Sequence, residues 1–161
     1  MPLTVADQIA AVLIDRLEEM VLGDYETEVV EVIRPTRLGN YTPQDRQIVV
    51  TQANPERVTE LDCPGNPPAL CWSQVFNIRC HLMPSETDET AIDLLCNQFA
   101  ADVIKAVCIP ANGWHTFGNY AIDAQFQAIE NIETGEAMDG VNVPLMVMYR
   151  VAENDPYTVR A

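Results

Sequence analysis

The chain has 161 residues, 48% of them hydrophobic, and its 24 acidic and 9 basic side chains give a formal net charge of −15. This length fits one domain with its own core, and the apolar share argues against a disordered chain. The charge argues against a protein that reads DNA sequence, because an acidic surface repels the phosphate backbone. The same charge suits a passage through which DNA slides without sticking, or it serves solubility alone.

The first expected element is an amphipathic helix over residues 4–22. Thr4 is a suitable N-cap, with Asp7 at the third helical position as in a capping box. Gly23 can take the left-handed conformation that closes a helix. Apolar side chains recur at helical spacing through this segment, at Val5, Ile9, Val12, Leu13, Leu17, Met20 and Val21.

Two strands are expected next. Polar and apolar side chains alternate from Tyr25 onward, which predicts a strand over residues 25–34. Residues 35–45 contain glycine, asparagine and proline and predict the turn of a hairpin. The second strand of this hairpin is expected over residues 46–52.

A proline-rich segment and a long strand follow. Residues 54–71 predict a stiff extended loop, because prolines deny strand hydrogen bonds and restrict the preceding residue. Such a loop suits a contact surface, although a plain connector is equally compatible. Residues 72–82 predict the third strand, with Trp72 and Phe76 as core anchors.

The C-terminal half predicts a second helix and two further strands. The helix is expected over residues 87–107, a fourth strand over 119–130, a hairpin loop over 131–142 and a fifth strand over 144–152. Residues 153–161 are expected to leave the sheet as a tail, which is either loose or docked on a neighbouring subunit.

Together the elements predict one α+β domain over residues 1–152, followed by the tail at 153–161. The expected order is helix, three strands, helix, two strands, with the two helices packed on one face of a mostly antiparallel sheet.

The cysteines and the termini indicate an intracellular protein. No apolar run approaches the roughly 20 residues of a membrane span, and the N-terminus lacks the pattern of a signal peptide. An odd number of cysteines without a secretory signal predicts reduced thiols. Cys80 and Cys96 fall at predicted core positions and are expected to act as small buried hydrophobes. The cysteines are Cys63, Cys71, Cys80, Cys96 and Cys108.

No catalytic motif is present, and we expect neither an enzyme, a metal site nor a cofactor. His81 and His115 lack zinc-site spacing from the cysteines. The best remaining catalytic candidate is Cys63 or Cys71 acting with His115. A nucleophilic thiol needs an electropositive setting, whereas acids and prolines surround both cysteines in the sequence.

Several loops combine aromatic or proline residues with arginine, a composition typical of protein contacts, although scattered surface loops look similar. We expect Arg37→Glu to leave the fold intact and to impair assembly if these loops form an interface. The candidate contact residues are Arg34, Arg37, Tyr41, Arg46, Pro67, Trp114, Tyr157 and Arg160.

The element order, the helix start TVADQIA, the loop RPTRLGNYTP and the ending MYRVAENDPY resemble the tail-terminator and tail-completion proteins of long-tailed bacteriophages. The resemblance implies a structural virion protein, made in the host cytoplasm, that forms a six-membered ring. Such a ring caps the tail tube, joins it to the head connector and passes DNA through an acidic lumen without binding it specifically.

Other functions remain open. Head-completion proteins of the phage neck share this size and general fold, and the proline-rich segment 54–71 is longer than a simple hairpin connection. A protein-binding module without a ring is a second alternative, and a thiol-dependent enzyme is a third.

Overall fold

The computed structural model describes residues 1–35, 41–83, 91–133 and 139–160. It is an α+β fold with two helices and a mostly antiparallel sheet, as predicted. The helices are α1 (Val5–Leu22) and α2 (Ile92–Val107), with short 3-10 turns η1 (Thr59–Leu61) and η2 (Trp114–Thr116). The strands are β1 (Glu31–Ile33), β2 (Gln47–Gln52), β3 (Glu56–Arg57), β4 (Ala69–Leu82), β5 (Asp123–Phe126), β6 (Glu130–Glu133), β7 (Asp139–Ala152) and β8 (Asp155–Val159).

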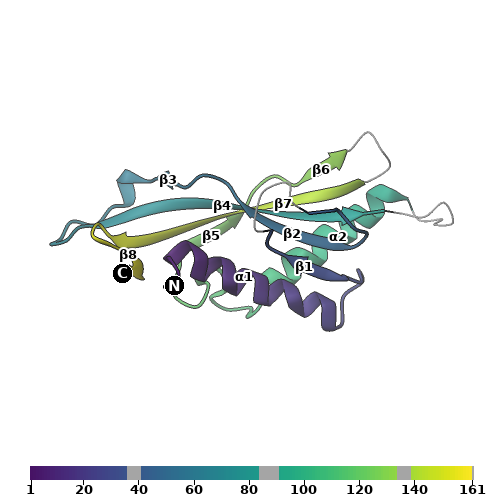
Figure 1. Ribbon diagram of the computed structural model, residues 1–161, viewed down its shortest axis with the longest axis horizontal. Coiled ribbons are helices and arrows are strands. Elements are labelled where there is room, and N and C mark those ends of the chain that lie inside the picture. Colours follow the sequence, from purple (N-terminus) through teal and green to yellow (C-terminus); the bar gives the residue numbers. More distant parts are fainter. Residues whose placement is uncertain (36–40, 84–90, 134–138, 161) are drawn as a thin grey trace.

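A long antiparallel ribbon of β4 and β7 forms the centre of the sheet and runs along most of the molecule (Figure 1). Each strand has 14 residues, and the pairing extends from Ala69 opposite Ala152 to Leu82 opposite Asp139. The strands predicted at 72–82 and 144–152 are therefore confirmed and prove longer. Short strands line both sides of the ribbon: β2 and β3 pair with β4, and β5, β6 and β8 pair with β7.

Both helices pack on one face of the sheet, as expected, and the core lies between them and the ribbon (Figure 1). Alternate ribbon residues face the helices because side chains alternate along a strand. Phe76 is fully buried, whereas Trp72 is only partly buried at the margin of the core. The largest fully buried side chains include Phe76, Phe99, Phe117, Ile9, Leu13, Leu17, Ile48, Ile78 and Leu145.

The N-terminus of α1 has the predicted capping arrangement. The Asp7 backbone N–H donates to the Thr4 hydroxyl at 3.2 Å, and that hydroxyl donates to the Asp7 carboxylate at 2.7 Å. At the other end, Gly23 has φ −167°, so the chain leaves the helix in an extended conformation. The expected left-handed closure at Gly23 was therefore wrong.

The first two strands do not form a hairpin. β1 and β2 run parallel, with Glu31 opposite Gln47, and β1 is shorter than the predicted strand at 25–34. A parallel pair needs a connection of about a dozen residues, and the stretch between these strands is long enough to supply it. Before β1, the Thr27 backbone N–H donates to the buried Asp102 carboxylate of α2 at 2.7 Å, so a helix rather than a strand holds this part.

The second half of the sheet also departs from prediction. The strand expected over 119–130 divides into β5 and β6, which pair with successive parts of β7. Part of the loop expected over 131–142 belongs to β6 and β7. The helix predicted from residue 87 is present from Ile92, and residues 84–90 lie outside the described part.

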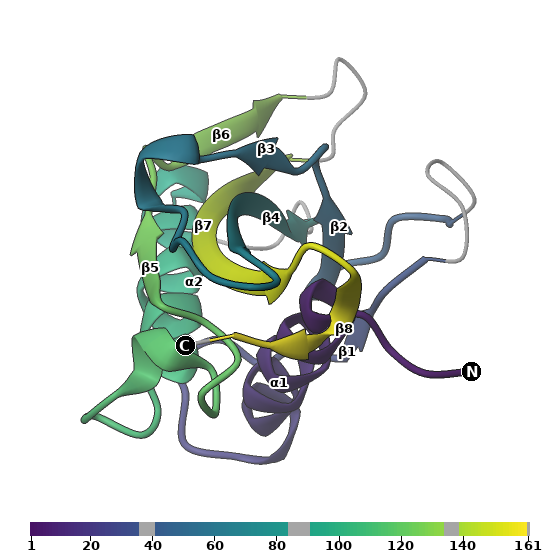
Figure 2. The same ribbon diagram turned by 90° about the vertical axis from the view of Figure 1, so that its left-hand side faces the viewer.

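The proline-rich segment and the C-terminal tail contain regular structure as well. The segment predicted as a loop over 54–71 holds β3, η1 and the first residues of β4. The tail does not leave the sheet, because β8 pairs with β7 next to α1 (Figure 2). The Gln8 amide links the two by donating to the Leu3 carbonyl at 2.9 Å and to the Tyr157 carbonyl at 3.2 Å.

Candidate interaction surfaces

The structure separates the predicted contact residues into different regions. Near β1 and β2, Arg34 pairs with Asp7 at 2.9 Å and Arg46 lies 3.5 Å from Asp45. Tyr41 lies close by, with its ring 6.0 Å from that of His81. Arg37 lies outside the described residues. Arg34 and Arg46 thus have acidic partners within their own chain, which the sequence did not indicate.

The remaining predicted residues lie elsewhere. Trp114 stacks on Phe126 with ring centroids 5.5 Å apart and is therefore packed within the domain. Pro67 lies in the turn before β4, at the end of the ribbon that also carries β8. Tyr157 of β8 is 47% exposed, and Arg160 just after β8 is exposed as well. Pro67 and Tyr157 thus lie at one end of the ribbon, and the Arg160 backbone N–H donates to the Arg150 carbonyl at 2.9 Å, between that end and the start of β5.

The sheet has two unlike edges. β1 is the last strand on one side and β5 on the other, and no further strand pairs with either within the described ranges. The Val30 backbone N–H donates to Arg46 beside β2, so by alternation the Ile33 N–H points away from the sheet. On β5, the Gln127 N–H donates to Pro144, which places the Ala124 and Phe126 N–H groups outward. The Asp123 carboxylate accepts from the Ala124 N–H at 2.9 Å and covers part of this edge.

A groove of about 580 Å³ lies where the ribbon extends past the start of α1. We call it the ribbon-end groove, and its lining includes Leu70, Trp72, Gln74, Tyr149, Val151 and Pro156. Two charged side chains near this end pair with each other. Arg57 lies over the Trp72 ring at 5.1 Å and bonds Asp62 at 2.6 Å. Asp62 also accepts from the Cys71 backbone N–H at 2.7 Å.

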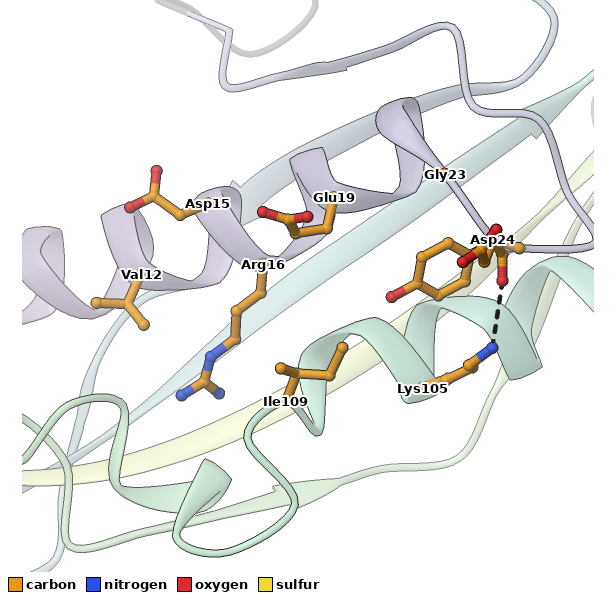
Figure 3. A pocket seen from close by; sticks show the side chains of 9 residues that line it. Val12, Asp15, Arg16, Glu19, Gly23, Asp24, Lys105 and Ile109 are labelled. Carbon is orange, nitrogen blue, oxygen red and sulfur yellow. Dashed lines mark hydrogen bonds between the residues drawn. The ribbon is translucent and has the colours of Figure 1, made fainter.

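A second cavity, of about 630 Å³, lies between α1 and the C-terminal part of α2 (Figure 3). We call it the interhelical cleft. Its lining residues are Val12, Asp15, Arg16, Glu19, Gly23, Asp24, Tyr25, Lys105 and Ile109. Along α1 these side chains follow helical spacing, so one face of the helix forms a wall of the cleft over two turns.

The basic residues of the cleft bind backbone carbonyls. The Arg16 guanidinium donates to the carbonyls of Val107 and Trp114, each at 2.8 Å, and lies 4.5 Å from the Phe117 ring centroid. Val107 is the last residue of α2, so Arg16 satisfies a carbonyl at the negative end of that helix. Burial lowers the pKa of Arg16 below its usual value. Lys105 donates to the Asp24 backbone carbonyl at 3.3 Å.

The carboxylates around the cleft have no such partners. Asp15, Glu19 and Asp24 are exposed, and within the described part of the chain none of their side chains makes an ion pair or hydrogen bond. Burial, then Glu19 and Asp102, raise the pKa of Tyr25 beside them. The sequence does show a concentration of acidic residues over 15–31, where Arg16 is the only base. The number of acids alone does not predict a cleft.

Cys71 lacks the setting of a nucleophilic thiol. Cys71 is buried, and this burial raises its pKa, the opposite of what a reactive thiolate requires. His115 lies on η2, where its ring contacts Trp114. Across the described residues, no group of three or more histidine, cysteine or acidic side chains could hold a metal ion.

His81 lies on the sheet face opposite Trp72, because side chains alternate along a strand, and it is buried there, only 5% exposed. Neither ring nitrogen has a hydrogen-bond partner among the described groups. Burial, followed by the nearby charge of Arg79, lowers the pKa of His81, which favours the neutral ring.

No helix in the described part of the chain is long and apolar enough to cross a membrane. The chain matches no protein-family model, and no curated protein matches its sequence.

Proposed function

We propose that this chain is a structural protein of a phage virion neck, acting as a tail terminator or tail-completion protein. In this proposal its copies form a six-membered ring that caps the tail tube and meets the head connector. The observation that carries the proposal is the pair of unlike edges, β1 and β5, on one sheet. The number of six copies in the ring and its place in the virion rest on the resemblance to tail-terminator proteins in element order and in the quoted sequence segments.

Unlike edges favour a ring over a simple dimer. An edge strand presents unpaired N–H and C=O groups that can add a strand from another chain. When the two joined surfaces differ, the contact is heterologous, and repeating it gives a closed ring or an open filament. Both β1 and β5 have outward N–H groups. Each copy in a ring could therefore pair with one neighbour through β1 and with the other through β5.

The charge distribution is compatible with a passage for DNA. Exposed carboxylates occur on α1 at Glu18, on β3 at Glu56 and on β6 at Glu130. A ring of this chain would therefore have an acidic inner surface with either sheet face turned inward, and such a surface repels DNA.

A head-completion or neck adaptor protein is the nearest alternative and would use the same edges against different neighbours. A monomeric binding module would leave the edges unused. The thiol-dependent enzyme has the least support, because burial raises the pKa of Cys71.

Sedimentation velocity over a range of protein concentrations tests the ring. We expect wild type to form a closed species of defined mass, and Ile33→Pro to shift it to monomer because the proline removes an outward N–H of β1. Circular dichroism should show that the variant remains folded. Wild type that stays monomeric at every concentration, alone and with tail tubes, would contradict the proposal.

A further inference from the structure

We propose that the interhelical cleft is a docking groove for a basic amphipathic helix of a partner protein. This inference goes beyond ring formation and does not depend on it, because the cleft lies on the helical face and the ring contacts are assigned to the sheet edges.

The cleft has an apolar base and an acidic rim. Val12 of α1 and Ile109, just after α2, supply apolar surface on its two sides (Figure 3). Ile109 is 48% exposed, although a large aliphatic side chain gains free energy by burial. A cavity of about 630 Å³ lies within the roughly 300–1,000 Å³ range of binding pockets. It can therefore accept several side chains of an incoming helix.

The positions of the carboxylates fit a helix lying along α1. Asp15 and Glu19 are one helical turn apart on the cleft side of α1, which places their Cβ atoms roughly 6 Å from each other. Lysine or arginine side chains one turn apart on a partner helix repeat at the same interval. Asp24 extends the acidic rim beyond the end of α1.

Charge complementarity selects a basic occupant. Arg16 and Lys105 are the bases in the cleft, and both donate to backbone carbonyls, so within the described residues the three rim carboxylates have no ion-pair partner and outnumber the two bases. The last turn of α1 contains no basic residue, although cations there would stabilise the helix. Carboxylates at this end are locally unfavourable, and a cationic partner would relieve that cost.

Fluorescence anisotropy with a labelled synthetic peptide tests the inference. The probe is an amphipathic peptide of about 18 residues with leucine on one face and lysine on the other, and its control carries glutamate in place of lysine. We expect the lysine peptide to bind more weakly as salt is added, and the glutamate peptide not to bind. Combined Asp15→Asn, Glu19→Gln and Asp24→Asn should weaken binding of the lysine peptide by about tenfold or more.

Matched variants separate the groove from general attraction to an acidic protein. Combined Glu56→Gln, Glu60→Gln and Glu130→Gln removes the same charge from exposed sites on β3, η1 and β6 and should leave affinity within about twofold. Ile109→Ser should weaken binding, whereas Leu94→Ser, at a similarly exposed site on α2 (49% against 48%), should not.

Three results would overturn the inference. One is absence of lysine-peptide binding. Another is equal weakening by the two sets of neutralised acids, which would show long-range attraction only. The third is a change in oligomeric state caused by the cleft variants, since a second copy would then occupy the groove. The edge variant Ile33→Pro should bind the peptide like wild type, so failure of the ring and failure of the groove give different results.

Discussion

The Arg57–Asp62 pair at the ribbon end and the basic residues of the interhelical cleft use their charges in different ways. At the ribbon end, Arg57 pairs with Asp62, and Asp62 also fixes the backbone of Cys71. In the cleft, Arg16 and Lys105 bind carbonyls and leave nearby carboxylates without partners. The comparison indicates that the Arg57–Asp62 pair stabilises the fold, whereas the acids at the cleft are available to another molecule.

The largest effect is expected from Arg16→Met. The substitution leaves the carbonyls of Val107 and Trp114 without their charged donor and should lower the free energy of unfolding by about 2–3 kcal/mol. Urea denaturation measures the change. Lys105→Met removes one long hydrogen bond and a cation–π contact with the Tyr25 ring at 4.8 Å, and at this exposed site it should cost at most about 1 kcal/mol. Equal losses in the two variants would show that Arg16 does not join the helices.

Asp62→Ala should cost about 2 kcal/mol, because the Cys71 N–H loses its acceptor and Arg57 loses its partner. Its control is Glu60→Ala on the neighbouring turn, where the carboxylate is exposed. Chemical denaturation of both variants should show a clear loss for Asp62 alone. If Asp62→Ala left the free energy of unfolding unchanged, the Asp62 contacts with Arg57 and Cys71 would not stabilise the ribbon end.

Asp7→Asn should cost about 1 kcal/mol at neutral pH, a typical value for loss of helix capping. The Thr4 hydroxyl, and then Arg34, lower the pKa of Asp7 in the folded chain. The carboxylate therefore stabilises the fold above its ordinary pKa of about 3.9, and this contribution disappears as pH falls through the lowered pKa. Denaturation at several pH values should show the gap between wild type and variant closing in acid. A gap that persists at the lowest pH would point to a steric cause.

The smallest effect is expected from combined Glu18→Gln and Glu19→Gln near the end of α1. Removing negative charge there should raise the free energy of unfolding by up to about 0.5 kcal/mol. Differential scanning calorimetry can resolve the corresponding rise in melting temperature. A destabilised double variant would show that these carboxylates belong to the fold, and the contrast with Asp62 would then be lost.

Periodicity and capping were enough to predict the two helices and the two strands of the central ribbon, but not that these strands pair with each other. The features that were not predicted depend on contacts between residues far apart in the sequence. The parallel pairing of β1 with β2 depends on the path between them, and Asp102 of α2 keeps residues near Thr27 out of the sheet. The C-terminal strand pairs with β7, and the Gln8 amide of α1 also binds its Tyr157 carbonyl.

The candidate surfaces were predictable only in part. Tyr157 and Arg160 are exposed as a contact role requires, but Trp114 is packed against Phe126. The cleft could not be predicted, because the partners of Arg16 are backbone carbonyls and a sequence does not show which carbonyls a side chain will reach.

The most direct test of assembly through two unlike edges is to mix two folded variants, each with one edge blocked, and to weigh the products by native mass spectrometry. Ile33→Pro blocks β1 by removing an outward N–H, and Ala124→Pro blocks β5 because a proline ring on an edge strand obstructs the approach of a further strand. Each variant alone should be monomeric, and the mixture should form heterodimers but no larger species, because each partner supplies one intact edge. Variants that assemble alone like wild type, or a mixture that stays monomeric while wild type assembles, would contradict head-to-tail pairing of these edges.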